Sequence, residues 1–267
     1  MKNKVVIVTG ASSGIGKACA WYFANKGSKV VLAARNAQKL EEISKQMILK
    51  GLKCLAVQVD VSVEDDCKRL IAETIQTFQV IDVLVNNAGI SMRAILEEVD
   101  LSVIKKVMDV NFYGAVFCTK YALPFILQSK GSIVGVSSIA GYKGLPGRTA
   151  YSASKFAMQG FLESIRIENL EKNLHVLIAC PGFTASNIRN TALSKDGNIQ
   201  AESPRDEKSM MSADEVAEKI YFAVVKRQNS LVLTINGKLT VFLNKILPSF
   251  VDRLVFNHLK KEPNSPF

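Results

Sequence analysis

Short apolar runs alternate with helical patterns along most of this chain, and this alternation restricts the fold more than any other feature. The runs expected to be strands are 5–8, 29–33, 54–59, 80–85, 132–136, 176–179 and 231–234. The segments expected to be helices are 18–25, 40–49, 64–78, 101–127, 150–170 and 212–227. Continuous apolar strands that alternate with helices are typical of a parallel sheet covered on both faces. The sequence therefore predicts an α/β fold: a doubly wound, seven-stranded parallel sheet with helices on both faces.

The length and the even composition favour one domain. No change in composition divides the 267 residues, so we expect a single domain over 1–267. The interval 183–211 is polar and irregular, and a long irregular loop in a compact domain is often a substrate lid. Ser212 and Glu215 then open the next helix with the Ser-x-x-Glu pattern of a capping box. We therefore expect a substrate loop at about 183–211.

Composition argues against several classes of function. The five cysteines are odd in number and form no CxxC pair, which argues against a disulfide framework or a thiolate zinc site. His175 and His258 are too few for a histidine-rich site, so we expect no metal. The net charge is +10, but Lys and Arg are spread along the chain rather than clustered with aromatic residues, so we expect no nucleic-acid partner. Free cysteines and a first apolar run too short for a signal peptide predict a cytoplasmic protein.

A glycine loop, Thr9–Gly16, separates the first expected strand from the first expected helix. Gly10 permits a tight turn, Gly14 lets the backbone approach a pyrophosphate, and Gly16 lets the helix pack on the strand. The N–H groups and the dipole at the start of the helix favour an anion there. The spacing is GxxxGxG rather than the general GxGxxG. The loop predicts a dinucleotide site.

The end of the second expected strand indicates which dinucleotide binds. NAD sites carry an Asp or Glu about 20 residues after the glycines, bonded to the ribose 2′-OH. Here the segment 33–36 reads Ala-Ala-Arg-Asn, and no carboxylate follows until Glu41. Arg35 can pair with a 2′-phosphate through its planar guanidinium, although an ordinary surface arginine fits the same position. The missing acid and the added base together favour NADP(H).

A tyrosine and a lysine form the candidate chemical centre. Tyr151 and Lys155 are four residues apart on an expected helix, which places them on one face. A nearby ammonium lowers the pKa of a tyrosine from about 10, so Tyr151 can exchange a proton with a carbonyl or alcohol oxygen. Ser138 follows the strand 132–136, and its hydroxyl can hold that oxygen. Taken alone, a Tyr-x-x-x-Lys pair can also occur by chance on a helix surface.

Seven motifs in order give the sequence a family resemblance. They are TGASSGIG at 9–16, Asp60-Val61, Asn86-Asn87-Ala88-Gly89, Asn111, Ser137-Ser138, Tyr151-Ser152-Ala153-Ser154-Lys155 and Pro181-Gly182. Over about two thirds of its length the chain resembles the short-chain dehydrogenase/reductase family. The resemblance implies a Rossmann-like fold. It also implies an NADP(H)-dependent oxidoreductase that moves a hydride between nicotinamide and a carbonyl or secondary alcohol carbon.

The resemblance also implies catalytic roles for four residues. Asn111 would kink the long helix and hold a water in a proton relay to Lys155. Ser138 would orient the substrate oxygen, and Tyr151 would be the acid/base. Lys155 would lower the pKa of Tyr151 and bond the nicotinamide ribose.

The cofactor contacts implied by the resemblance run through the same motifs. They are Gly10, Ser12, Ser13, Gly14, Ile15, Gly16, Arg35, Asn36, Asp60, Val61, Asn87, Ala88, Gly89, Tyr151, Lys155, Pro181, Gly182, Phe183 and Thr184. Asp60 would contact the adenine ring, with the alternative that it caps the following segment. After Pro-Gly many relatives have a Thr that bonds the carboxamide; here Thr184 or Ser186 can supply that bond.

The chain closes with an amphipathic extension at about 239–261, interrupted by Pro248. It can pack over the substrate cleft or a partner subunit, or insert shallowly into a membrane surface. Its apolar side chains favour a hydrophobic substrate. From the resemblance we also expect a homodimer or homotetramer, paired through the helices that hold Asn111 and Tyr151.

Two other functions use the same fold. A non-catalytic NADP(H)-binding sensor and a membrane-surface scaffold both fit a dinucleotide-binding domain, because fold does not fix function. A sensor needs no tyrosine acid/base, so the intact set Asn111, Ser138, Tyr151 and Lys155 favours the enzyme.

Overall fold

The computed structural model describes residues 1–185, 187–200, 210–263 and 265–267. Within these residues a seven-stranded sheet has the order β3-β2-β1-β4-β5-β6-β7, and all neighbouring strands are parallel. The strands are β1 Val5–Thr9, β2 Lys29–Ala34, β3 Cys54–Gln58, β4 Val83–Asn86, β5 Ser132–Val136, β6 His175–Cys180 and β7 Ser230–Val232. The predicted α/β, doubly wound, seven-stranded parallel fold is confirmed.

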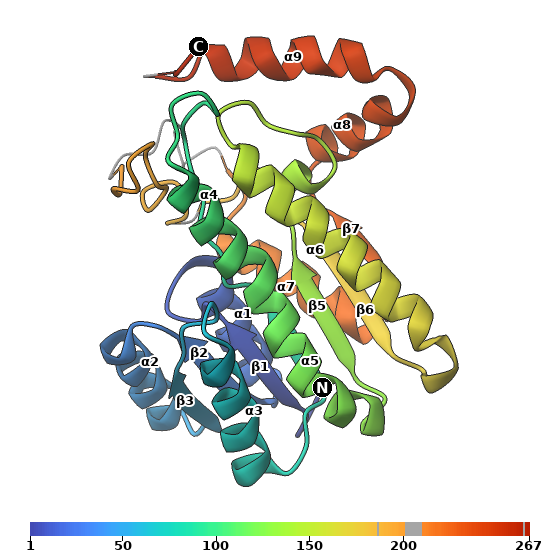
Figure 1. Cartoon of the computed structure of the whole chain (residues 1–267). Helices are drawn as coiled ribbons and strands as arrows, with labels where there is room; N and C mark the ends of the chain where they lie inside the picture. Colours follow the sequence, from blue (N-terminus) through green and yellow to red (C-terminus); the bar gives the residue numbers. More distant parts are fainter. Residues whose placement is uncertain (186, 201–209, 264) are drawn as a thin grey trace.

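Helices cover both faces of this sheet (Figure 1). They are α1 Gly14–Asn25, α2 Ala37–Leu49, α3 Glu64–Phe78, α4 Leu101–Met108, α5 Gly114–Gln128, α6 Thr149–Glu168 and α7 Ala213–Val225, with short 3₁₀ turns at Ile139–Gly141 and Leu170–Lys172. One core cluster packs α1, α2 and α7 on one face, and a second packs α3, α4, α5 and α6 on the other. Each central strand is therefore buried on both sides, which explains its continuous apolar sequence.

The strand order reverses between β1 and β4, and this reversal places the site. From β1 the chain adds β2 and β3 on one side, and it then returns to add β4 and the later strands on the other. In open α/β sheets a crevice forms beyond the carboxyl ends of the strands where the order reverses. The glycine loop after β1 and the Asn87–Gly89 segment after β4 border that crevice.

The predicted helix 101–127 contains a π-helical turn, Asp109–Tyr113, between α4 and α5. Such turns are rare and occur often at functional sites. In the described part of the chain, Leu101–Gln128 is also the one helical stretch long and apolar enough to cross a membrane, by length and composition alone. It packs against α3 and α6 as a core helix, and core helices pass the same two criteria.

Several predicted boundaries were wrong by a few residues, and at two strand ends a polar group explains the shift. The strand β4 begins at Val83 rather than 80, and the carboxylate of Asp82 accepts hydrogen bonds from Lys4 Nζ and Val5 N, both at 2.8 Å. The strand β7 ends at Val232 rather than 234, because Thr234 caps the next helix by accepting from Gly237 N. The predicted capping box of Ser212 and Glu215 is confirmed at the start of α7.

The C-terminal extension forms two helices, α8 Ile235–Ile246 and α9 Pro248–Lys260. Pro248 takes the first position of α9, where its missing N–H costs no helical hydrogen bond. Both helices lie at the top of Figure 1, at the end of the molecule opposite the N-terminus.

Candidate active site

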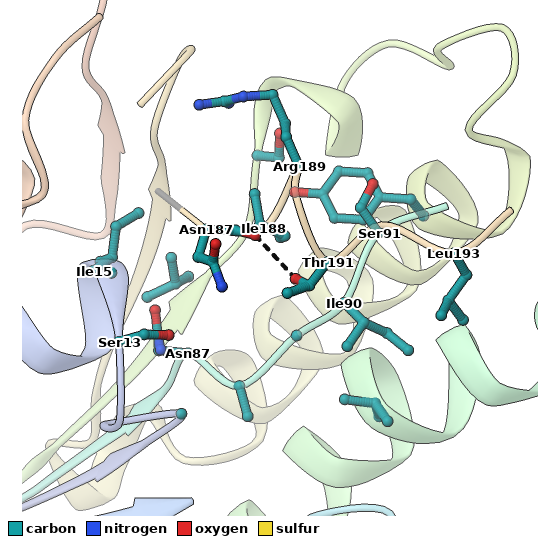
Figure 2. A pocket seen from close by; sticks show the side chains of 18 of the residues that line it. Ser13, Ile15, Asn87, Ile90, Ser91, Asn187, Ile188, Arg189, Thr191 and Leu193 are labelled. Atoms are coloured by element: carbon teal, nitrogen blue, oxygen red, sulfur yellow. Dashed lines mark hydrogen bonds between the residues drawn. The ribbon is translucent and has the colours of Figure 1, made fainter. Parts of the chain in front are cut away.

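A cavity of about 830 Å³ opens at the reversal of strand order. Every predicted catalytic and cofactor residue lines it except Gly16 and Asn111. The lining predicted residues are Gly10, Ser12, Ser13, Gly14, Ile15, Arg35, Asn36, Asp60, Val61, Asn87, Ala88, Gly89, Ser138, Tyr151, Lys155, Pro181, Gly182, Phe183 and Thr184. Figure 2 shows Ser13, Ile15 and Asn87 on one side of it and Thr191 and Leu193 across from them. The fold thus brings together residues that lie as far apart in the chain as 10 and 184.

The glycine loop has little room for larger residues. Gly10 and Gly14 have φ of +67° and +52°, in the left-handed region that favours glycine. A Cβ on Gly16 would lie 2.3 Å from the Gly10 carbonyl oxygen and 2.4 Å from Asn87 Nδ2. Gly16 therefore lies beneath the loop and keeps it close to α1 and β4, rather than lining the cavity.

Thr9, which the sequence reasoning did not single out as a site residue, joins the two strands at the reversal. Its Oγ1 accepts from Asn87 N and Ala88 N, each at 3.0 Å, and Asn87 Nδ2 donates to Thr9 O at 2.8 Å. These bonds position the segment after β4 against the glycine loop. The position of Thr9 at the carboxyl end of the first strand, directly before the glycines, is the signal that could have identified it.

At the nucleotide end of the cavity lie the exposed Arg35 and two polar side chains, Asn36 and Asp60, that already accept hydrogen bonds within the protein. Arg35 is exposed and lines the cavity. Asn36 caps α2 by accepting from Lys39 N. Asp60 Oδ1 accepts from Ser62 N at 3.0 Å and Ser62 Oγ at 2.7 Å, so the capping alternative is present together with the cavity position.

Lys155 is nearly fully buried, with 3% of its surface exposed. Its Nζ donates to the Val136 carbonyl at 2.9 Å, at the end of β5. Burial lowers the pKa of Lys155 to about 8. The ammonium lies 5.7 Å from the centre of the Tyr151 ring. Lys155 is therefore held beside Tyr151 by the sheet itself.

The pKa of Tyr151 shifts in the direction opposite to the predicted one. Burial raises the pKa of Tyr151, while a hydrogen bond with Ser138 and the charge of Arg148 lower it by smaller amounts. The prediction that Lys155 brings this pKa below its ordinary value was wrong for this arrangement. Desolvation of the phenolate outweighs the favourable neighbours, and at neutral pH Tyr151 holds its proton.

Asn111 lies in the π-helical turn and is fully buried. Its Oδ1 accepts from Ile90 N at 2.8 Å, and its Nδ2 donates to Ile90 O at 2.9 Å and to Ser154 Oγ at 3.0 Å. The side chain thus ties the segment after β4 to α6. A Cβ on Gly89 would lie 3.3 Å from Asn111 Oδ1 and 3.6 Å from Lys155 Nζ, so all three groups are neighbours. The predicted water relay through Asn111 stays a prediction.

The sequence predicts the substrate side of the cavity only as the interval 183–211, without assigning a role in substrate binding to any single residue. Within it, Thr191 Oγ1 donates to Asn187 O at 3.0 Å (Figure 2), and Thr184 Oγ1 donates to Gly182 O at 3.2 Å. Ser186, the alternative to Thr184, and 201–209 of the predicted loop lie outside the described residues. Lining residues that sequence reasoning missed include Ser91, Lys106, Leu145 and Arg148, whereas Thr191, Leu193 and Ile199 lie inside the predicted substrate loop without having been singled out.

Arg148 lies three residues before Tyr151, directly ahead of the predicted helix 150–170, and this closeness to a candidate catalytic residue is the signal that could have identified it. Among the residues that the structure describes, no group of three or more His, Cys, Asp and Glu is placed to hold a metal ion.

Comparison with known proteins identifies the family. Residues 4–197 match the family model described as short chain dehydrogenase. The chain is 35% identical over 271 residues to dehydrogenase/reductase SDR family member 7B of Mus musculus, covering 99% of this chain and 84% of the mouse protein. It is 41% identical over 188 residues to 11-beta-hydroxysteroid dehydrogenase 1A of Arabidopsis thaliana, covering 70% of this chain and 54% of the plant protein.

A solved structure shares the fold. It is an alcohol dehydrogenase from the archaeon Thermococcus sibiricus complexed with 5-hydroxy-NADP, with a TM-score of 0.77 and 24% identity over 87% of this chain and 96% of that chain. The family model and the mouse relative together establish that the chain belongs to the short-chain dehydrogenase/reductase family of oxidoreductases.

Proposed function

We propose that the protein is an NADP(H)-dependent oxidoreductase that transfers a hydride between nicotinamide and a carbonyl or secondary alcohol carbon of a hydrophobic substrate. One observation carries the proposal: Ser138, Tyr151 and Lys155 line the same cavity as the glycine loop. A cofactor held by that loop and a substrate oxygen held by Ser138 therefore share one space. The volume, about 830 Å³, lies in the range of small-molecule sites.

The residues that line the cavity fit a dinucleotide in kind. Gly10 and Gly14 line the cavity without a side chain, so the loop backbone borders it, and the first turn of α1 begins there with N–H groups that favour an anion. When bound, the nicotinamide supplies or accepts the hydride. Pro181, Gly182, Phe183 and Thr184 would border the ring, and Asn87, Ala88 and Gly89 would line the path to it.

The proton is handled by Tyr151. In carbonyl reduction its phenol proton passes to the substrate oxygen, and in alcohol oxidation the phenolate takes that proton back. Because burial raises the pKa of Tyr151, the phenol form that can donate this proton predominates at neutral pH. Ser138 would donate a hydrogen bond to the developing oxyanion, and Lys155 would hold the cofactor ribose. Asn111 would support both by fixing α6 against the segment after β4.

Turnover with a chemical series tests this function. Purified protein is mixed with NADPH and a series of hydrophobic ketones and aldehydes, and with NADP⁺ and the matching alcohols. The loss or gain of NADPH absorbance is recorded. We expect reduction of at least one hydrophobic ketone, in keeping with the steroid dehydrogenase name of a relative. Binding of NADPH without turnover across the series would favour the sensor function instead.

We infer that 1–267 form one domain, in which 183–211 act as the substrate loop and 239–261 as an amphipathic extension. The extension leaves a set of large apolar side chains about half exposed. They are Leu239, Phe242, Ile246, Leu247, Phe250, Leu254 and Phe256. Its acidic residue Asp252 is paired with Lys143 at 2.5 Å, which leaves the surface between these apolar groups basic. Apolar side chains with neighbouring basic groups favour an anionic membrane surface.

A flotation experiment tests the membrane contact. We expect the wild type to float with anionic liposomes and the double variant Phe242→Asp/Phe250→Asp to stay in the soluble fraction, because each carboxylate would have to enter the lipid boundary. Leu49→Asp, at an exposed leucine of α2, is the control and should still float. Failure of both proteins to float would remove the membrane proposal, and equal flotation of both would show that these two side chains of the extension do not make the contact.

The same family membership supports a homodimer or homotetramer. Leu101, Tyr113 and Phe156 expose apolar surface on α4, the π-helical turn and α6, where the predicted pairing lies. Light scattering at micromolar concentration should give the mass of a dimer or tetramer for the wild type and for Val225→Glu on α7. Phe156→Glu should lower that mass. A monomer in all three samples would contradict the proposal.

A further inference from the structure

The last 34 residues contact the segment that joins Ser138 to Tyr151. We call Thr234–Phe267 the C-terminal arm and 139–150 the connecting segment. Asn244 Nδ2 donates to Tyr142 O at 3.0 Å, and Lys143 Nζ binds Asp252 Oδ1 at 2.5 Å. At the far end, a Cβ on Gly147 would lie 3.2 Å from the Phe267 ring. The C-terminal arm thus follows the connecting segment along its length.

Glu262 is the buried charge at the end of this contact. Its side chain is 5% exposed, and its Oε2 lies 3.0 Å from Arg148 Nη2 and 3.7 Å from Arg93 Nη2. Arg93 also donates to the Pro263 carbonyl at 2.6 Å. The two arginines come from different segments, so one carboxylate from the C-terminal arm holds both.

One of the two arginines lines the cavity, and the other lies close to its wall. Arg148 lines it directly, and Arg93 follows the lining residue Ser91 after β4. Arg93 N donates to Leu193 O at 2.8 Å, and Ala94 N donates to Gly147 O at 3.0 Å. The segments after β4, β5 and β6 therefore meet where Glu262 binds, and all three border the substrate side.

Arg148 also connects Glu262 to the helix that carries Tyr151. It occupies the N-cap position of α6, and Tyr151 lies in the first turn of that helix. Leu145 N donates to Ser152 Oγ at 3.0 Å and Arg148 N to Leu145 O at 3.1 Å, which fixes the turn before the helix. A shift of Arg148 therefore moves the start of the helix that carries Tyr151.

We propose that Glu262 is a positioning residue for Tyr151, acting through Arg148 and Arg93 to hold the connecting segment and the substrate side of the cavity. This inference rests on the proposed function. Glu262 does not itself line the cavity. A buried ion pair is weak evidence for net stability, but removing one partner leaves buried charges uncompensated and releases the segments they join. Displacement of a catalytic group by about 1 Å can lower turnover by roughly 100-fold.

The test compares three variants of the full chain with saturating NADPH: Glu262→Gln, Glu262→Asp and the control Glu73→Gln. Glu73 pairs with Arg69 on the exposed face of α3 and does not line the cavity. For Glu262→Gln we expect kcat to fall roughly 10- to 100-fold while the NADPH dissociation constant stays within about twofold. Glu262→Asp restores the charge and should recover part of that loss, and Glu73→Gln should match the wild type.

Amide hydrogen exchange supplies a readout that does not need turnover. In Glu262→Gln the amides of Leu145 and Arg148 should exchange faster than in the wild type, while those of β1 keep their protection. Unchanged exchange at Leu145 and Arg148, or an unchanged kcat, would overturn the inference. A general loss of protection that includes β1 would assign Glu262 to global stability and overturn it as well. Absence of turnover in the wild type would refute the proposed function. The exchange result would still show whether Glu262 holds the connecting segment in place.

Discussion

Tyr151→Phe is expected to lower kcat by roughly 100- to 10,000-fold and to leave NADPH binding within about twofold. The ring keeps its packing, because only the hydroxyl is removed. The lost group is the proton donor to the substrate oxygen and a hydrogen-bond partner of Ser138. Cofactor affinity should survive because the glycine loop, Arg35 and Lys155 are unchanged. Steady-state turnover and NADPH fluorescence titration on the same preparation measure the two quantities.

Tyr22→Phe is the matched control for this variant. Tyr22 lies on α1, bonds Glu218 at 3.1 Å and does not line the cavity, so its loss should not change turnover. A Tyr151→Phe protein with near wild-type kcat would show that another group moves the proton. Loss of NADPH binding along with turnover would instead assign Tyr151 a role in cofactor binding or folding.

Arg35→Ala is the second large expected effect, and it concerns cofactor choice. Arg35 lines the cavity at the end of β2, and the nearest following carboxylate, Glu41, is paired with Lys45 at 2.6 Å on the exposed face of α2. A guanidinium bonded to a 2′-phosphate is a charge-assisted contact, and exposure to solvent weakens it. We expect the NADPH dissociation constant to rise roughly tenfold and that of NADH to change by less than about twofold.

Lys45→Ala removes a neighbouring positive charge of α2 that does not line the cavity. Wild type, Arg35→Ala and Lys45→Ala are titrated with both cofactors and followed by fluorescence. The comparison separates a specific contact between Arg35 and the 2′-phosphate from the general effect of positive charge. The control should retain the preference for NADPH. Equal weakening of NADPH in both variants would mean that net charge, rather than Arg35, attracts the phosphate. Tighter binding of NADH by the wild type would contradict the cofactor preference itself.

The nucleotide half of the site could be predicted because its requirements are local. A turn with positive φ needs glycine, a buried parallel strand needs apolar residues, and the reversal of strand order needs only the sequence of elements. Gly10, Gly14 and the end of β2 therefore occupy the expected places. Gly16 shows the limit of such reasoning, since its motif position is right while its contact is with Gly10 and Asn87 rather than the cavity.

The acidity of Tyr151 could not be predicted from spacing. Lys155 lies near it as the i, i+4 rule requires, but the pKa depends on how much solvent the whole fold removes from the phenol. The contact of Arg148 with Glu262 joins positions 114 residues apart, and no helical or strand periodicity carries that information. The extension at 239–261 was recognised as amphipathic, yet its packing on the connecting segment depends on single polar groups such as Asn244 and Asp252.

The most direct measurement follows a labelled hydride. Wild-type protein is incubated with a hydrophobic ketone that it reduces and with NADPH deuterated at the transferable position of the nicotinamide. The product alcohol is examined by mass spectrometry and NMR. Hydride transfer predicts one deuterium on the carbinol carbon and none from the solvent at that carbon, with product formed at least roughly 100-fold more slowly by Tyr151→Phe. A product without the label, or NADPH bound and never oxidised, would contradict the assignment of this site to nicotinamide-dependent reduction.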